Sequence, residues 1–103
     1  MNFEVDNIGF LKNAQSWNED WAKLKTQEIG IAWDDIDRRI VNALRSFYFE
    51  YDLSPAMRPL VKHIKTTVGE QYGSSIWLMQ RYGESPARVL ALLAGLPKPK
   101  NCL

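Results

Sequence analysis

The strongest candidate for covalent chemistry in this sequence is Cys102, the only cysteine of the chain, which stands one residue before the C-terminus. A thiolate is the nucleophile of sulfur chemistry, and an ordinary thiol with a pKa of ~8.5 is mostly protonated at neutral pH. The nearby cations of Lys98 and Lys100 favour the thiolate, whereas the terminal carboxylate opposes it. The sequence therefore predicts a carrier thiol that a partner activates, rather than a nucleophile activated in advance.

The segment before this cysteine cannot be helical. Gly95 is typical of the left-handed residue that ends a helix, and Pro97 and Pro99 favour extended backbone around them. The seven residues from Pro97 to the end could reach roughly 20–25 Å when fully extended. We therefore predict a flexible C-terminal arm over residues 96–103 with the thiol near its tip. An incidental terminal cysteine is the alternative, which we consider weaker because a lone exposed thiol is a liability.

A second group with possible binding chemistry consists of cations. Arg58, Lys62 and Lys65 are spaced i, i+4 and i+7 on a predicted helix, with the lone His63 beside them. They could bind the terminal carboxylate, an acidic partner surface or RNA phosphates. The alternative is an ordinary solvated face, which we prefer for Lys65. His63 is interpreted as a surface or half-buried residue, because no nucleophile or base partner for it is visible.

Hydrophobic periodicity and start and stop signals predict five helices that carry the arm. The most regular amphipathic pattern covers residues 34–51, which we expect to be the central helix. Ser16 and Glu19 form a capping-box pattern, and Ser54 and Ser85 each precede a proline at a helix start. The predicted helices cover residues 17–28, residues 34–51, residues 55–68, a short helix for which Ser75 is the candidate cap and which ends at Gly83, and residues 86–94.

The length and composition predict one small domain. The 103 residues are 46% hydrophobic and 12% aromatic, with a net charge of +1, which excludes general disorder and a global field that attracts nucleic acid or membranes. We expect a mainly α fold, a small orthogonal bundle of about five helices, which becomes α+β only if an N-terminal hairpin forms. The predicted parts are a short extended or β segment (1–12), a helical body (13–95) and the arm (96–103).

Several classes of protein are not expected. No apolar run approaches the ~18 residues of a membrane-spanning helix, and the N-terminal residues lack a signal-peptide pattern, so we expect a cytoplasmic protein. One cysteine and one histidine give no metal-site spacing, and we expect neither metal nor cofactor. A conventional enzyme with a self-contained active site is also not expected, because no phosphate loop or catalytic triad is visible.

The arm resembles the C-terminal signature of the TusE/DsrC family of sulfur-relay proteins, in which Gly-Leu-Pro-Lys-Pro precedes a penultimate cysteine. The matching residues here are Gly95, Leu96, Pro97, Lys98, Pro99 and Cys102. The resemblance continues in the same order through residues 9–11, residues 47–51, and residues 54–58 with 60–62. It implies that Cys102 accepts sulfur as a persulfide and that residues 95–99 serve in arm presentation and partner docking.

The same resemblance implies a supporting basic face. Arg58 and Lys62 belong to the family motif, and Arg88 keeps a positive charge where the family usually has lysine. Residues 3–11 are similar to the second half of a β-hairpin in the family. In the TusE branch, the implied partners are an upstream TusBCD-like donor complex and a downstream enzyme that 2-thiolates the wobble uridine of tRNA, with tRNA as a candidate member of that complex.

One departure separates this chain from the DsrC branch. That branch has a second cysteine eleven residues before the penultimate one, where this chain has Ala91. An intramolecular disulfide is therefore impossible, which favours a one-cysteine relay of the sulfurtransferase class. The alternative is a DsrC-like accessory or regulatory subunit, either a sulfite reductase partner or a helix-turn-helix DNA binder formed by residues 34–51 and 55–68. The DNA-binding alternative is weak, because the second helix is short of base-reading side chains.

Overall fold

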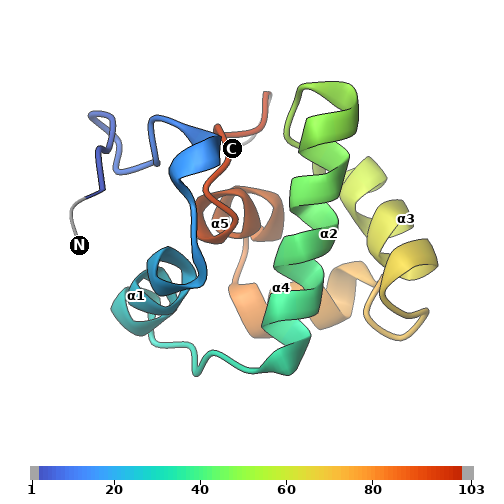
Figure 1. Cartoon of the computed structure of the whole chain (residues 1–103). Helices are drawn as coiled ribbons and strands as arrows, with labels where there is room; N and C mark the ends of the chain where they lie inside the picture. The colour runs from blue at the N-terminus through green and yellow to red at the C-terminus, as the bar shows by residue number, and fades with distance from the viewer. Residues whose placement is uncertain (1–2, 101–103) are drawn as a thin grey trace.

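The computed structural model describes residues 3–100, and within this range the chain forms a bundle of five α-helices (Figure 1). The only β feature of these residues is an isolated antiparallel bridge between Val5 and Leu11. The mainly α prediction is therefore confirmed, and the α+β alternative is not realised in residues 3–100. The helices are η1 (a 3₁₀ turn, Ala14–Ser16), α1 (Glu19–Ile29), α2 (Asp35–Tyr51), α3 (Met57–Thr67), α4 (Ser75–Tyr82) and α5 (Pro86–Leu93).

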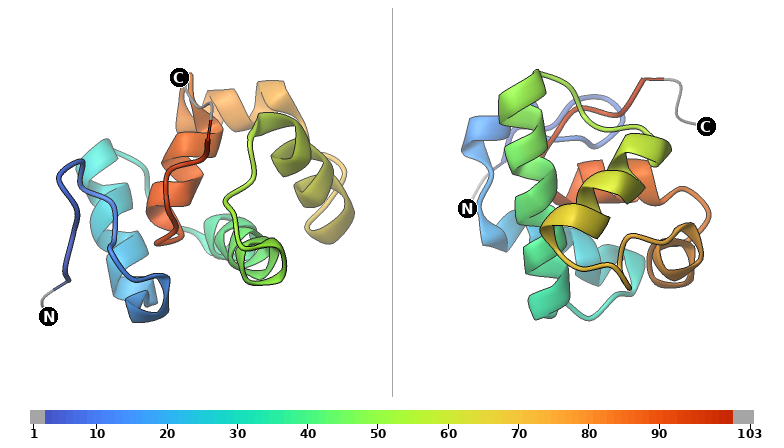
Figure 2. Two further views of the ribbon diagram at one scale, coloured as in Figure 1. Left: turned by 90° about the horizontal axis from the view of Figure 1, so that it is seen from above. Right: turned by 90° about the vertical axis from the view of Figure 1, so that its right-hand side faces the viewer.

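The last helix, α5, is the centre of the bundle. It packs against α1, α2, α3 and α4, and Figures 1 and 2 show it between α1 on one side and α2 and α3 on the other. Its residues Leu90, Ala91 and Leu93 are 0% exposed. The prediction that residues 34–51 form the central helix was therefore wrong. A strongly amphipathic helix has a polar face in solvent, whereas a central helix is apolar on most sides.

The helix starts follow local capping rules with three differences from prediction. Helix α1 is capped by Asn18, whose side chain accepts from the Trp21 N–H at 3.3 Å, so Ser16 instead ends η1. Ser74, rather than Ser75, caps α4. Helix α3 begins after Ala56, which has no capping side chain, and Ser54 lies too far upstream to cap it. The serines that were predicted as caps all lie near a helix start. The backbone conformation there determines which side chain can accept from the free N–H groups of the first turn.

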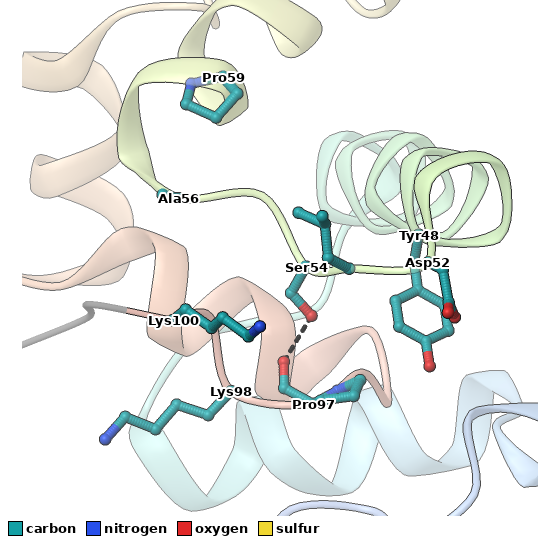
Figure 3. Close-up of a pocket in the computed structure, with 9 residues that line it drawn as sticks. Tyr48, Asp52, Ser54, Ala56, Pro59, Pro97, Lys98 and Lys100 are labelled. Atoms are coloured by element: carbon teal, nitrogen blue, oxygen red, sulfur yellow. Dashed lines mark hydrogen bonds between the residues drawn. The ribbon is translucent and has the colours of Figure 1, made fainter.

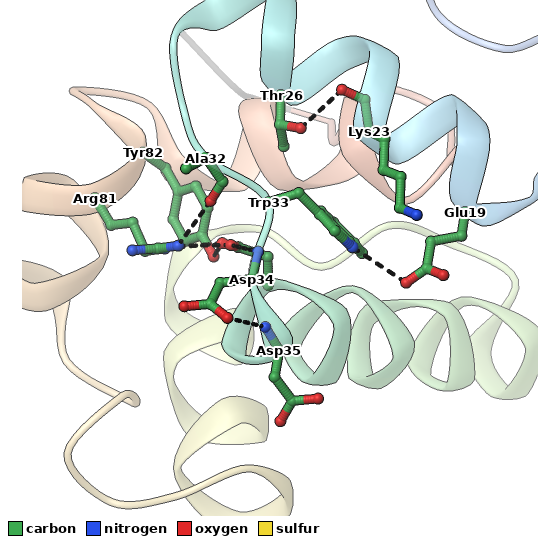
Figure 4. Close-up of polar contacts among 10 residues, drawn as sticks. Glu19, Lys23, Thr26, Ala32, Trp33, Asp34, Asp35, Arg81 and Tyr82 are labelled. Carbon is green, nitrogen blue, oxygen red and sulfur yellow. Dashed lines mark hydrogen bonds and ion pairs between the residues drawn. The ribbon is translucent and has the colours of Figure 1, made fainter.

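The start of α2 is tied to the end of α4 through Asp37, which is 0% exposed. Its carboxylate accepts hydrogen bonds from Arg81 Nε at 2.8 Å, from the Tyr82 hydroxyl at 2.6 Å and from the Asp34 N–H at 2.9 Å. Figure 4 shows Arg81 and Tyr82 reaching this helix start. Burial acts to raise the pKa of Asp37, but the bonds from Arg81 and Tyr82 outweigh it and hold the pKa below its usual range.

The N-terminal residues form a tight loop that packs on the end of α5. The Asp6 carboxylate accepts from the N–H groups of Ile8 at 3.0 Å and Phe10 at 2.9 Å, and Gly9 has a φ of 88°. Phe10 and Leu11 are consequently buried, at 2% and 4% exposure. None of the helices in residues 3–100 has the length and hydropathy of a membrane span.

Candidate functional site

The chain reverses direction directly after α5, at Gly95. The N–H of Gly95 donates to the Leu92 carbonyl at 3.2 Å, and the N–H of Leu96 donates to the Ala91 carbonyl at 2.9 Å. Gly95 has a φ of 69°, the left-handed conformation that such a helix end requires. The helix end predicted at this glycine is therefore present, and it starts the arm.

Gly95 is also the point of closest packing at this turn. A Cβ at this position would lie 2.6 Å from Trp17 Cδ1 and 3.0 Å from Leu11 Cδ2. Both distances are shorter than ordinary van der Waals contacts. The turn therefore requires glycine at this position for two reasons. Its backbone conformation is left-handed, and Trp17 occupies the space that a side chain would need.

Three consecutive carbonyls at the end of α5 accept hydrogen bonds from side chains that are distant in sequence. Trp21 Nε1 donates to Leu92 at 2.7 Å, and Trp17 Nε1 donates to Leu93 at 2.9 Å. Arg45 Nη1, from α2, donates to the carbonyl of Ala94 at 2.8 Å. These donors satisfy carbonyls that a helix C-terminus leaves without an intrahelical partner. We call the group formed by Trp17, Trp21, Arg45 and residues 92–95 the arm root.

Arg45 joins three segments of the chain at the arm root. Besides Ala94, its guanidinium donates from Nη2 to the Ala14 carbonyl at 3.0 Å. Its Cζ lies 4.4 Å from the centre of the Trp17 ring and 5.2 Å from that of Phe49, in the range of cation–π contacts. Burial lowers the pKa of Arg45, yet a guanidinium remains protonated at neutral pH.

The described part of the arm lies against the body. Leu96 is 0% exposed and belongs to the hydrophobic core, and Pro99 is buried. The Ser54 hydroxyl donates to the Pro97 carbonyl at 2.5 Å, while Lys98 and Lys100 are exposed. The sequence predicts a flexible arm, whereas residues 96–100 are packed here because Leu96 and Pro99 bury apolar surface. Cys102, the predicted carrier, lies outside the described residues.

A pocket of ≈ 320 Å³ lies between the arm, the end of α2 and the start of α3 (Figure 3). Its walls come from the end of α2, the connection to α3, the first turn of α3 and the arm itself. In Figure 3 the Lys98 side chain extends away from the pocket, and the Lys100 side chain extends toward it. The lining residues are Tyr48, Asp52, Leu53, Ser54, Ala56, Pro59, Pro97, Lys98 and Lys100.

The predicted basic residues occupy different places. Arg58 and Lys62 are exposed on α3, and it is Pro59, between them in sequence, that lines the pocket. Arg88 is on α5, with its Cζ 5.4 Å from the centre of the Phe10 ring. His63 lies half-buried between α3 and α2, with Nε2 2.9 Å from the Ala43 carbonyl oxygen.

Sequence reasoning missed two polar residues of this region. Arg45 was not singled out in the sequence, and Ser54 was interpreted only as a residue at a helix start. The partners of Arg45 are backbone carbonyls 31 and 49 positions away, and the partner of Ser54 is 43 positions away. Backbone carbonyls carry no sequence signal, so nothing in the local pattern indicated these contacts.

Comparisons with known proteins agree on one family. The family model described as "DsrC like protein" matches residues 1–103. The chain is 41% identical to the Sulfurtransferase TusE homolog of Haemophilus influenzae over 97% of this chain and 92% of that protein. It is 36% identical to Sulfurtransferase TusE of Escherichia coli K12, with the same coverage.

Solved structures give the same result. The structure is similar to that of Allochromatium vinosum DsrC, with a TM-score of 0.87 and 33% identity over 98% of this chain and 90% of that chain. It is also similar to the oxidized gamma-subunit of the dissimilatory sulfite reductase (DsrC) from Archaeoglobus fulgidus, with a TM-score of 0.79 and 28% identity over 98% of this chain and 92% of that chain.

Proposed function

Because this chain belongs to the DsrC-like protein family, we propose that it is a sulfur-relay protein whose carrier atom is the thiol of Cys102. The relatives named Sulfurtransferase TusE, at 41% and 36% identity, support the relay. The structural observation that carries the proposal is the arm root. The only cysteine of the chain follows a segment that three side chains tie to the body.

The proposed chemistry is transfer of a sulfane sulfur. The Cys102 thiolate attacks the terminal sulfur of a donor cysteine persulfide and forms a new S–S bond. The S–S bond of the donor breaks, and the donor cysteine leaves as a thiolate with the bonding electron pair. The same step then runs from Cys102 to an acceptor cysteine. The transfer involves no net oxidation or reduction, and a proton taken up by the leaving thiolate balances the one lost from Cys102.

The proposed partners are those that the resemblance to the TusE branch implies. The donor is a TusBCD-like complex, and the acceptor is an enzyme that 2-thiolates the wobble uridine of tRNA in the cytoplasm. Each transfer requires the thiol to enter a partner's active site. An arm of seven residues after Leu96 reaches roughly 20–25 Å when extended. Pro97 and Pro99 restrict its backbone, which lowers the entropy lost on docking.

The alternative function is that of a DsrC-like accessory or regulatory subunit without sulfur transfer. The likeness to the A. fulgidus gamma-subunit and to dissimilatory sulfite reductase I, at 28% and 26% identity, favours it. Ala91 weighs against it, because the chain lacks the second cysteine of the DsrC branch. Its position is also 0% exposed within α5, where the side chain serves packing.

The experiment that tests the relay is intact-mass measurement after incubation with a cysteine desulfurase, free cysteine and a TusBCD complex. We expect a gain of one sulfur atom that reductant removes and that Cys102→Ser does not show. The absence of this adduct, under conditions that load a known TusE protein, would contradict the relay. Cellular function retained by Cys102→Ser, or salt-sensitive binding to duplex DNA, would instead support the accessory or regulatory alternative.

A further inference from the structure

The arm root is held more firmly than a chain reversal requires. The bonds from Gly95 and Leu96 back to α5 are sufficient to end a helix and turn the chain. Trp17, Trp21 and Arg45 add three further bonds from outside α5. The contact of Arg45 is the last of these along the chain, on the carbonyl directly before Gly95.

Arg45 is suited to hold this carbonyl in a fixed direction. Its two terminal nitrogens bond two carbonyls, Ala94 at 2.8 Å and Ala14 at 3.0 Å, so the plane of the guanidinium is fixed. The ring of Trp17 packs on this plane, and Trp17 also blocks the space beside Gly95. A lysine has one point charge and cannot bond both carbonyls in the same way.

We propose that Arg45 is a positioning residue for sulfur transfer, because its bond to the Ala94 carbonyl fixes the backbone from which the arm starts. This inference rests on the proposed function. Transfer between two proteins requires the attacking and donor sulfurs to meet in a narrow geometry, and a misplaced reacting group slows such steps strongly. In this proposal Arg45 acts on how the arm enters the partner and leaves the intrinsic reactivity of Cys102 unchanged.

The test compares two sulfur donors on Arg45→Gln. Glutathione persulfide reaches the thiol without docking, and a TusBCD complex charged by a cysteine desulfurase requires it. We expect wild-type loading by glutathione persulfide and about tenfold slower loading at saturating TusBCD, the size expected from losing the charge-assisted hydrogen bond to the Ala94 carbonyl, the one of the two Arg45 bonds that lies on the arm root. The TusBCD concentration for half-maximal rate should change less than the maximal rate. Arg45→Lys should restore part of the loss, because it retains one bond.

Arg39→Gln is the matched control. Arg39 is also on α2 and also donates to a backbone carbonyl, that of Val68 at 2.7 Å, but it has no contact at the arm root. Amide hydrogen exchange at Leu96 supplies a readout independent of sulfur transfer, and it should accelerate in Arg45→Gln and not in Arg39→Gln.

Two results would overturn the positioning role. One is wild-type loading of Arg45→Gln by TusBCD although Leu96 exchange has accelerated. The other is an equal loss with both donors, which would place the effect on the fold or the thiol. A wild-type chain that neither donor loads would contradict the proposed function itself, and this is seen before any variant is compared.

Discussion

The hydroxyl of Ser54 donates a hydrogen bond to the carbonyl of Pro97, 43 residues further along the chain, at 2.5 Å. Ser54 lies in the connection between α2 and α3 and is 6% exposed. It is the side-chain contact through which this connection holds the described part of the arm beyond Leu96. The arm is therefore held at its buried root, by the burial of Leu96 and Pro99, and by this hydrogen bond.

Ser54→Ala should loosen the arm beyond its root. One neutral hydrogen bond is lost, so we expect a decrease of about 1 kcal/mol in the free energy of unfolding. Backbone order parameters at Lys98 and Lys100 should fall, while that at Leu96 stays unchanged. Ser46→Ala is the control, since Ser46 bonds only the nearby Ala43 carbonyl. Equal order parameters at Lys98 in both variants would show that the Ser54 bond does not restrain the arm.

Gly95→Ala should be strongly destabilising for two reasons that can be separated. A φ of 69° costs an alanine about 1–2 kcal/mol, and the added Cβ would overlap Trp17. We expect a total loss of about 3 kcal/mol or more in urea unfolding. Gly30→Ala is the matched control. Gly30 has a φ of 82°, and apart from its chain neighbours no atom of residues 3–100 lies within 4 Å of its Cβ position, so it should lose only the conformational part. Equal losses in the two variants would contradict the close packing at the arm root.

Asp37 should contribute to the loss of folding stability at acid pH. Its pKa is lowered in the folded protein, so its stabilisation is complete above the unfolded value of about 3.9 and is lost as the pH falls through the folded pKa. Asp37→Asn should lose about 3 kcal/mol at pH 7, because Arg81 loses its buried partner. Its stability should then vary less with pH below about 4 than that of the wild type.

Chemical denaturation at several pH values measures both effects. Asp35→Asn, which removes the exposed pair with Arg38, should cost under about 1 kcal/mol at pH 7. If the stability of Asp37→Asn falls with acid pH as much as that of the wild type, another group is responsible for the loss of stability at acid pH.

The basic residues of the family motif should affect association with partners. If Arg58 and Lys62 dock an acidic surface, Arg58→Gln and Lys62→Gln should slow loading by TusBCD at low donor concentration by a few fold and weaken its salt dependence. Lys65→Gln is the control, because Lys65 is also exposed on α3 and is interpreted as solvated. Three variants with the same rates would indicate that this face is simply solvated.

The sequence was most informative where the signal is local. The start of α2 at Asp34 and the helix end at Gly95 depend on residues within one turn, and both were predicted. The central place of α5 was not predicted, because an apolar pattern over eight residues does not say what surrounds it. The contacts of Arg45 and Ser54 were not predicted for a related reason, since their partners are carbonyls that only the folded chain brings close.

Because Leu96 is buried in the core, the helical body depends for its stability on the first residue of the arm. This side chain is 0% exposed in the hydrophobic core, so a protease that removes the arm at or before residue 96 also opens a cavity in the core. A clipped molecule would be poorly folded and a substrate for further degradation. Only cleavage after residue 96 would therefore leave the core filled.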